Sequence, residues 1–482
     1  MLIFLSSVLL LIAGYLTYGL FVEKVFGIDR SRPTPAIELA DGVDYVSMPA
    51  WKTYLIQLLD IAGIGPIFGP IMGALYGPEA LLWIVVGSIF AGGVHDFFSG
   101  MLSVRNGGEN LPTIMGHTLG RHMRSIMLVF ALLLLVLVGV VFVLSPAKML
   151  ENLTQVNVGY YVAAIFIYYF VATIVPIDKI IGRFYPFLGG LLLFMTFGIF
   201  FGMVFGGHKL LPHLNFVQVH PDELPMWPLL FITLSCGAIS GFHSTQSPLM
   251  SRCISNEKYG RFVFYGAMIS EGIIALLWAT VGLSLYEPAV LHGLIEQGTA
   301  AFVVDETSRN LLGAAGGFLA VLGVIVLPIT SGDTAFRSAR LIISEAAHLP
   351  QKSIGRRLLI AVPLFVIGFI VSQVQFDVIW RYMGWSNQTL ATLVLWSAAF
   401  YLAKNSKFHW IATVPAVFLT GVVVTFICYA QIGLRLPYQT SVIIGVTVAT
   451  LSFIGFFAYS LKNVRFADQN PLSLLSKSTF KD

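Results

Sequence analysis

In two segments rich in glycine and proline, we expect backbone groups to be left without helix hydrogen bonds and so to be free to bind a solute. The first segment, DIAGIGPIFGPIMG, contains Gly63, Gly65, Pro66 and Gly69. The second segment, SCGAISGFHSTQSP, contains Gly237, Ser240, Gly241 and His243. Proline removes a helix hydrogen-bond donor, and the helix N-terminus after such a break offers free amide hydrogens to an anion. These residues therefore predict a binding site for a small anionic or zwitterionic solute, although close packing between two helices also favours glycine.

Ionisable side chains inside apolar segments form a second group of candidates, because a charge is costly there. The group consists of Asp60, His95, Asp96, His243, Glu271, Asp333 and Arg337. Asp60 directly precedes the first segment, and we predict that its carboxylate couples binding to a proton or a cation. His95 and Asp96 are predicted to form a gate or a proton relay, since histidine exchanges protons near neutral pH. Glu271 is predicted as a second proton site.

Each of these ionisable groups also has a structural interpretation. His95 and Asp96 are equally suited to holding the neighbouring loop, His243 to capping a broken helix, and Glu271 to forming a buried hydrogen bond. Asp333 and Arg337 are four residues apart, so they share a helix face and are expected first of all to neutralise each other.

Hydroxyl and amide side chains complete the candidate site. Thr330 and Ser331 offer oxygen atoms that suit a sodium-like cation beside freed carbonyl groups, or they bond back to their own helix. Asn387 and Gln388 are adjacent amides within an apolar segment, where either the substrate or a neighbouring helix must supply their partners.

Membrane helices must position these residues. Of the 482 residues, 57% are hydrophobic and 11% are charged, against about 25% charged residues in soluble domains. This composition predicts an all-α integral membrane protein. The three cysteines exclude a disulfide scaffold, and the net charge of +4 does not favour nucleic-acid binding.

Apolar stretches near or above the length that crosses a bilayer number about thirteen. They cover residues 2–22, 53–77, 79–103, 125–148, 159–176, 184–206, 228–248, 259–287, 311–346, 356–375, 376–403, 408–430 and 438–461. The first stretch lacks a basic start and a cleavage site, so we expect a retained span. In alternate loops lie 23 of the 28 basic residues, which predicts an N-terminus outside the cell and a cytoplasmic C-terminus.

The two glycine-rich segments lie in the second and seventh predicted spans, so they cross the membrane in opposite directions. This spacing predicts an inverted repeat of five plus five helices with broken helices at a central binding site. The predicted parts are a first span with its linker at 1–52, one repeat at 53–206 broken near 63–73, a second at 207–403 broken near 237–248, and two further spans with a tail at 404–482.

Motifs for nucleotide-driven transport or hydrolysis are not found: the chain has no phosphate-binding loop, no zinc-spaced Cys/His set and no nucleophile motif. We therefore predict no catalytic residues, no metal and no cofactor. The expected function is secondary active transport of a small solute with a coupling ion, and a passive channel or a membrane sensor remains the alternative.

Seven strings together resemble the carbon starvation protein CstA family. They are TPAIELADGVDYV, AGIGPIFGPIMGALYGP, AGGVHDFFSGMLSVRNGG, CGAISGFHSTQSP, YGAMISEG, SGDTAFRSAR and GWSNQTLA. The resemblance implies a LeuT-like fold related to the amino acid-polyamine-organocation superfamily. It also implies uptake of peptides or pyruvate across the plasma (inner) membrane of a bacterium or archaeon short of carbon, with a proton favoured over sodium as the coupling ion.

Overall fold

The computed structural model describes residues 2–42, 44–174, 177–208, 220–351 and 353–469. Within these ranges the chain is helical, and its β-type pairing is limited to one isolated bridge between Met48 and Ile254. Residues 209–219 near the start of the second predicted repeat, and residues 470–482, lie outside the described residues. The predicted all-α class is confirmed.

The helices follow one another with short connections. The first half contains α1 (Leu2–Leu16), α2 (Tyr18–Phe26), α3 (Pro35–Glu38), α4 (Ala50–Ile61), α5 (Gly65–Gly73), η1 (Ala74–Tyr76), α6 (Glu79–Gly87), η2 (Ser88–Gly92), α7 (Gly93–Arg105), α8 (Leu111–Leu119), α9 (Arg121–Thr154), α10 (Val158–Ile174) and α11 (Ile177–Phe205). The second half contains α12 (Met226–Thr233), α13 (Gly241–Ser251), η3 (Glu257–Tyr259), η4 (Arg261–Tyr265), α14 (Gly266–Leu285), α15 (Pro288–Ala346), α16 (Ile354–Val371), α17 (Phe376–Lys404), α18 (Trp410–Tyr429) and α19 (Tyr438–Gln469).

Every predicted span coincides with a helix or with consecutive helices. Nine helical stretches in the described part of the chain are long and apolar enough to cross a bilayer, and the bent pair of α4 and α5 makes a tenth if it counts as one span. Other predicted spans correspond to shorter helices, such as α10 with 17 residues and α13 with 11. The full set of thirteen crossings stays a prediction.

Both predicted breaks are present. The first break separates α4 from α5, whose axes differ by 49°. The second break separates α12 from α13. Within it, Gly237 has a φ of +92°, which side chains with a Cβ atom rarely adopt. Gly63 and Gly237 lie in the breaks, whereas Pro70 and Pro248 lie inside α5 and α13. Most of the predicted ranges 63–73 and 237–248 is therefore helical, and the breaks lie at their N-terminal ends.

Two π-helical turns precede helices that carry buried acids. The turn η2 leads into α7, which contains Asp96, and the turn η4 leads into α14, which contains Glu271. The hydroxyl of Tyr265 in η4 donates a hydrogen bond of 2.7 Å to the Ile89 carbonyl in η2. This bond joins the two π-turns to each other.

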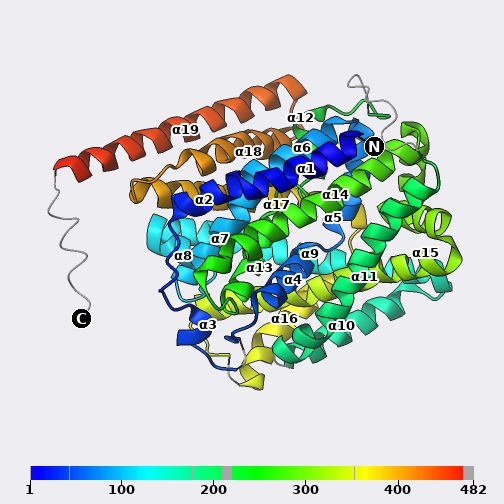
Figure 1. The fold of residues 1–482 in the computed structure, drawn as a ribbon, viewed down its shortest axis with the longest axis horizontal. Helices are drawn as coiled ribbons and strands as arrows, with labels where there is room; N and C mark the ends of the chain where they lie inside the picture. Colours follow the sequence, from blue (N-terminus) through cyan, green and yellow to red (C-terminus); the bar gives the residue numbers. More distant parts are fainter. Residues whose placement is uncertain (1, 43, 175–176, 209–219, 352, 470–482) are drawn as a thin grey trace.

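The first and last helices pack on the outside of this arrangement. Figure 1 shows α19 along one edge of the molecule, with α18 between it and the remaining helices. At the other end of the chain, α1 packs against α14. The assignment of these helices as additions to two inverted repeats stays a prediction.

Candidate functional site

The two breaks lie against each other. A Cβ atom added to Gly65 would clash with the side chain of Cys236, and one added to Gly69 would lie 2.9 Å from the Thr233 carbonyl oxygen. The Cα atom of Pro66 lies 3.7 Å from the Cβ position of Gly237. Close packing between the broken helices, which was the alternative interpretation, therefore accounts for part of the glycine pattern.

Two amides of α17 bind the backbone of the second break. The Asn387 Oδ1 atom accepts hydrogen bonds from the Phe242 amide at 2.7 Å and from the Ser240 hydroxyl at 3.1 Å. The Gln388 Nε2 atom donates to the Phe231 carbonyl at 3.0 Å. Asn387 thus caps the N-terminus of α13. The sequence left open whether the substrate or a neighbouring helix supplies the partners of the two amides, and in the structure the bonds listed here go to the broken helix α12–α13.

Hydroxyl groups of α15 approach the first break. Ser331 donates a hydrogen bond of 3.1 Å to the Leu59 carbonyl, one of the last carbonyls of α4. Thr330 instead bonds back to Leu327 at 2.8 Å on its own helix. Ser331 thus contacts a carbonyl at the end of α4, whereas Thr330 bonds back to its own helix. The cation role of both hydroxyls stays a prediction.

A cavity lies between the two breaks. Its lining consists of Ile61, Ile64, Gly65, Val138, Phe142, Cys236, Phe242, Trp380, Met383 and Asn387. The first break forms one wall, the second break forms another, and α9 and α17 supply the rest. Most of the lining is apolar, with the Asn387 amide among its polar groups, as is usual for small-molecule sites.

Two of the predicted substrate-binding residues, Gly65 and Asn387, line this cavity. Gly63 packs beside it, because an added Cβ atom there would lie 2.7 Å from the ring of Phe142. Aromatic lining residues such as Phe142 and Trp380 were not predicted, since nothing in an apolar helix distinguishes a cavity wall from a lipid-facing side chain. Cys236 was not predicted either, although its place inside the second glycine-rich segment is a signal that could have identified it.

Four predicted ionisable residues meet in one group, which we call the buried cluster: His95, Asp96, His243 and Glu271. The Nδ1 atom of His243 lies 2.9 Å from Asp96 Oδ2, and its Nε2 atom lies 3.2 Å from Glu271 Oε2. His95 Nδ1 lies 2.7 Å from the other oxygen of Asp96. All four side chains are fully buried. The cluster joins α7, α13 and α14.

The remaining ionisable candidates lie apart from these direct contacts. Asp333 Oδ2 is 3.9 Å from Arg337 Nη2 within α15, so the two charges face each other as expected for residues four apart. Asp60 is fully buried in the last turn of α4, directly before the first break. Its predicted coupling role stays a prediction.

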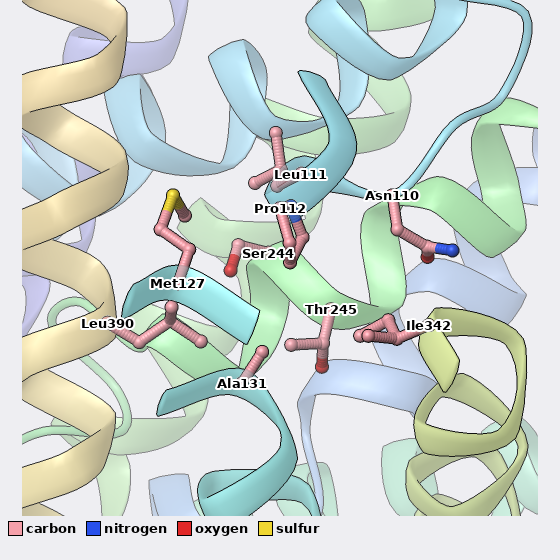
Figure 2. A pocket seen from close by; sticks show the side chains of 9 residues that line it. All are labelled: Asn110, Leu111, Pro112, Met127, Ala131, Ser244, Thr245, Ile342 and Leu390. Carbon is pink, nitrogen blue, oxygen red and sulfur yellow. The ribbon is translucent and has the colours of Figure 1, made fainter. Parts of the chain in front are cut away.

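A second pocket lies beside α13. Figure 2 shows Ser244 and Thr245 of α13 near Asn110, Leu111 and Pro112, with the pocket completed by Met127, Ala131, Ile342 and Leu390. Arg252 follows α13 in the chain, and its Nη2 atom pairs with Glu345 Oε1 at 2.9 Å. The sequence did not single out this pair, because the partner of a charged side chain so far away in the chain is set by packing.

Comparison of sequences places the chain among membrane transporters. An uncharacterized membrane protein of Haemophilus influenzae is 46% identical to this chain. The alignment covers 62% of this chain and 95% of that protein. This chain is 24% identical, over 86% of its length, to 79% of the peptide transporter CstA of Escherichia coli. It is also 26% identical, over 61% of its length, to half of the pyruvate/proton symporter BtsT of the same organism.

Comparison of structures shows the LeuT-like fold that the break spacing and the resemblance predicted. A manganese transporter of Eremococcus coleocola matches 89% of this chain and 99% of its own, with a TM-score of 0.57 and 16% identity. MhsT in complex with L-phenylalanine matches 86% of this chain with a TM-score of 0.56 and 13% identity. The family model described as carbon starvation protein CstA matches residues 1–159 and 146–294, more than half of the sequence. This chain therefore belongs to the carbon starvation protein CstA family.

Proposed function

We propose that this protein is a secondary active transporter that imports peptides or pyruvate across the inner membrane during carbon shortage, driven by proton symport. The observation that carries the proposal is the cavity lined by both broken helices. Discontinuous helices around a central site are the usual binding architecture of secondary transporters. The names of the related peptide and pyruvate transporters support the same class of substrate.

The geometry of the cavity supports a small carboxylate as the substrate. Gly65, the first residue of α5, lines the cavity, so the positive end of this helix is near the bound solute. At the second break, the Phe242 amide is already bonded to Asn387. We therefore assign the substrate carboxylate to the N-terminus of α5 and its apolar part to Phe142, Trp380 and Met383.

The name of one relative supports a proton as the coupling ion. At the first break, the Ser331 hydroxyl donates its hydrogen to the Leu59 carbonyl. Both oxygens keep lone pairs of the kind that a sodium ion requires, so this contact does not choose between the two ions. The related symporter BtsT is named for proton coupling.

The two pockets support alternating access. The first pocket lies between the breaks, and the second lies along α13 after the break. With the N-terminus outside the cell, as the loop charges predict, the second pocket is on the cytoplasmic side. We propose that the substrate leaves through it when α13 moves relative to α8 and α15.

Transport by the purified protein in liposomes tests the proposal. We expect labelled pyruvate, dialanine or trialanine to exchange saturably against the same unlabelled compound. We also expect uphill accumulation under an imposed pH gradient and none under a sodium gradient alone. Uptake that only follows the solute gradient would instead identify a channel, and binding without any exchange would identify a sensor.

A further inference from the structure

We infer that the buried cluster of His95, Asp96, His243 and Glu271 is the proton-binding group of the transport cycle and controls the second break through Gly237. The inference rests on the proposed proton symport and names the residues that perform it. It assigns coupling to the meeting point of α7, α13 and α14, away from Asp60 in α4.

The charge balance of the cluster requires one exchangeable proton. With His243 charged and His95 neutral, the carboxylates of Asp96 and Glu271 leave a net charge of minus one. A fully buried, uncompensated charge is costly, and one additional proton makes the cluster neutral. Among the described residues, His95 Nε2 is buried without a hydrogen-bond partner, and Glu271 Oε2 has its 3.2 Å contact with His243 Nε2. Both His95 and Glu271 are therefore able to carry this proton.

The ionisable groups of the cluster act mainly on one another. The main electrostatic partners of Asp96, His243 and Glu271 in the described structure are one another and His95. The segments packed against the cluster carry further ionisable groups, which include Tyr54, Asp60, Glu79, Cys236, Tyr265, Asp333, Arg337, Arg340, Glu345 and Tyr401. Tyr265 donates to Ile89, and Asp333 faces Arg337. Among these further groups, Cys236 interacts electrostatically with Glu271.

Glu271 connects the cluster to the backbone of the second break. Its Oε1 atom accepts a hydrogen bond of 3.1 Å from the Gly237 amide, and the Gly237 carbonyl accepts one of 3.0 Å from the Ser88 hydroxyl. A charged carboxylate accepts more strongly than a neutral carboxylic acid. Protonation of Glu271 therefore loosens Gly237, and Cys236, the next residue, lines the substrate cavity.

The position of the two acids in the chain supports the same role. Asp96 and Glu271 follow the π-turns η2 and η4, which Tyr265 joins. Their helices are the third and eighth predicted spans, so the acids occupy corresponding helices of the two predicted repeats. π-turns occur frequently at functional sites, and here each one shifts the helix register just before an acid of the cluster.

The test compares Glu271→Gln and Asp96→Asn with wild type in liposomes, using whichever of pyruvate or dialanine the wild type exchanges. Glutamine keeps the oxygen that accepts from Gly237 but does not ionise. We expect the ratio of accumulation under a pH gradient to exchange without a gradient to fall about tenfold or more relative to wild type. Substrate-induced proton uptake, followed with a pH dye in weakly buffered detergent solution, should disappear. Glu287→Gln, an exposed site at the start of α15, is the matched control.

The outcomes separate the two proposals. No exchange and no accumulation by the wild type overturns both the proposed function and the cluster. Wild-type accumulation that persists in Glu271→Gln and in Asp96→Asn overturns the cluster alone. Loss of accumulation in Asp60→Asn, with both cluster variants active, would move the proton site to α4.

Discussion

At the scale of single residues, the Asn387 amide is one of the side chains that stabilise the second break. Asn387 on α17 binds the backbone amide of Phe242 and the hydroxyl of Ser240, and its Nδ2 atom lies 3.5 Å from the Ser235 carbonyl. These contacts satisfy groups on both sides of Gly237. A side chain that the sequence offered equally to substrate or to a helix thus serves the helix, and it also lines the cavity.

Replacing Asn387 tests this cap. Asn387→Ala leaves the Phe242 amide buried without its partner, which should cost about 1–3 kcal/mol of unfolding free energy. The measurement is the chemical denaturation midpoint in detergent, together with binding of pyruvate or dialanine. Thr389→Ala on the same helix is the control, because Thr389 bonds only to Trp385 of its own helix. An equal loss of stability in both variants would contradict the capping role.

Glu257 is a second residue whose replacement is expected to lower the free energy of unfolding by a large amount. Its buried carboxylate accepts from Arg105 Nε and Nη2 at 3.1 Å each and from the Asp29 amide at 2.7 Å. Glu257→Gln leaves Arg105 without its charge partner and should cost about 3–5 kcal/mol, as for other buried ion pairs.

The control for Glu257 is Asp305→Asn, which breaks the more exposed pair with Arg309 and should cost at most about 1 kcal/mol. Denaturation of both variants in the same detergent provides the comparison. Similar stability losses for the two variants would show that Glu257 is no more important than a surface pair.

At the scale of helices, the broken segments depend on close backbone contact. Gly241 begins α13 where it meets α17, and an added Cβ atom would clash with the Asn387 carbonyl and lie 2.6 Å from the Ala391 amide nitrogen. Both atoms belong to the backbone, so no side-chain movement relieves the contact. The helix must shift away from α17, and the Asn387 cap must lengthen.

Gly241→Ala is therefore expected to weaken substrate binding about tenfold or more while the protein still folds. Equilibrium binding of the transported compound is the readout, and gel filtration in detergent checks the fold. Gly190→Ala in α11 is the matched control, because no atom lies within 4 Å of its Cβ position. Unchanged affinity in Gly241→Ala would show that α13 does not need this approach.

At the scale of the whole molecule, a polar network holds α8, α13 and α15 together beside the second pocket. Glu345 Oε1 pairs with Arg252, and its Oε2 atom accepts from the Asn110 amide and the Thr113 hydroxyl at 3.1 Å each. Arg252 Nε also donates to the Gly108 carbonyl at 2.9 Å. These bonds close the side of the molecule that the loop charges assign to the cytoplasm.

Opening this network should expose the second pocket. We expect Glu345→Gln to raise the reaction of Thr245→Cys with a membrane-impermeant thiol reagent about fivefold or more in inside-out vesicles. Mass spectrometry of the labelled peptide separates this site from the three native cysteines. Asp305→Asn, which breaks an exposed pair with Arg309, is the control. Faster labelling from the opposite side would reverse the proposed orientation.

The sequence determined the local features of this protein. Apolar composition and length predicted the membrane helices and their order, and glycine with proline predicted both breaks, because each of these signals acts on neighbouring residues through backbone hydrogen bonding and solvation. The family resemblance was visible in the same short strings.

Only the tertiary structure decided which ionisable groups meet. Asp96 and His243 are 147 residues apart in the chain, whereas the spacing of Asp333 and Arg337 already predicted that these two charges face each other. The packing of α7, α13 and α14 brings His243 between Asp96 and Glu271 and leaves Asp333 beside Arg337. A local pattern does not encode this choice, because the energy of a charge pair depends on the distance between side chains of different helices, which the packing of the whole bundle sets.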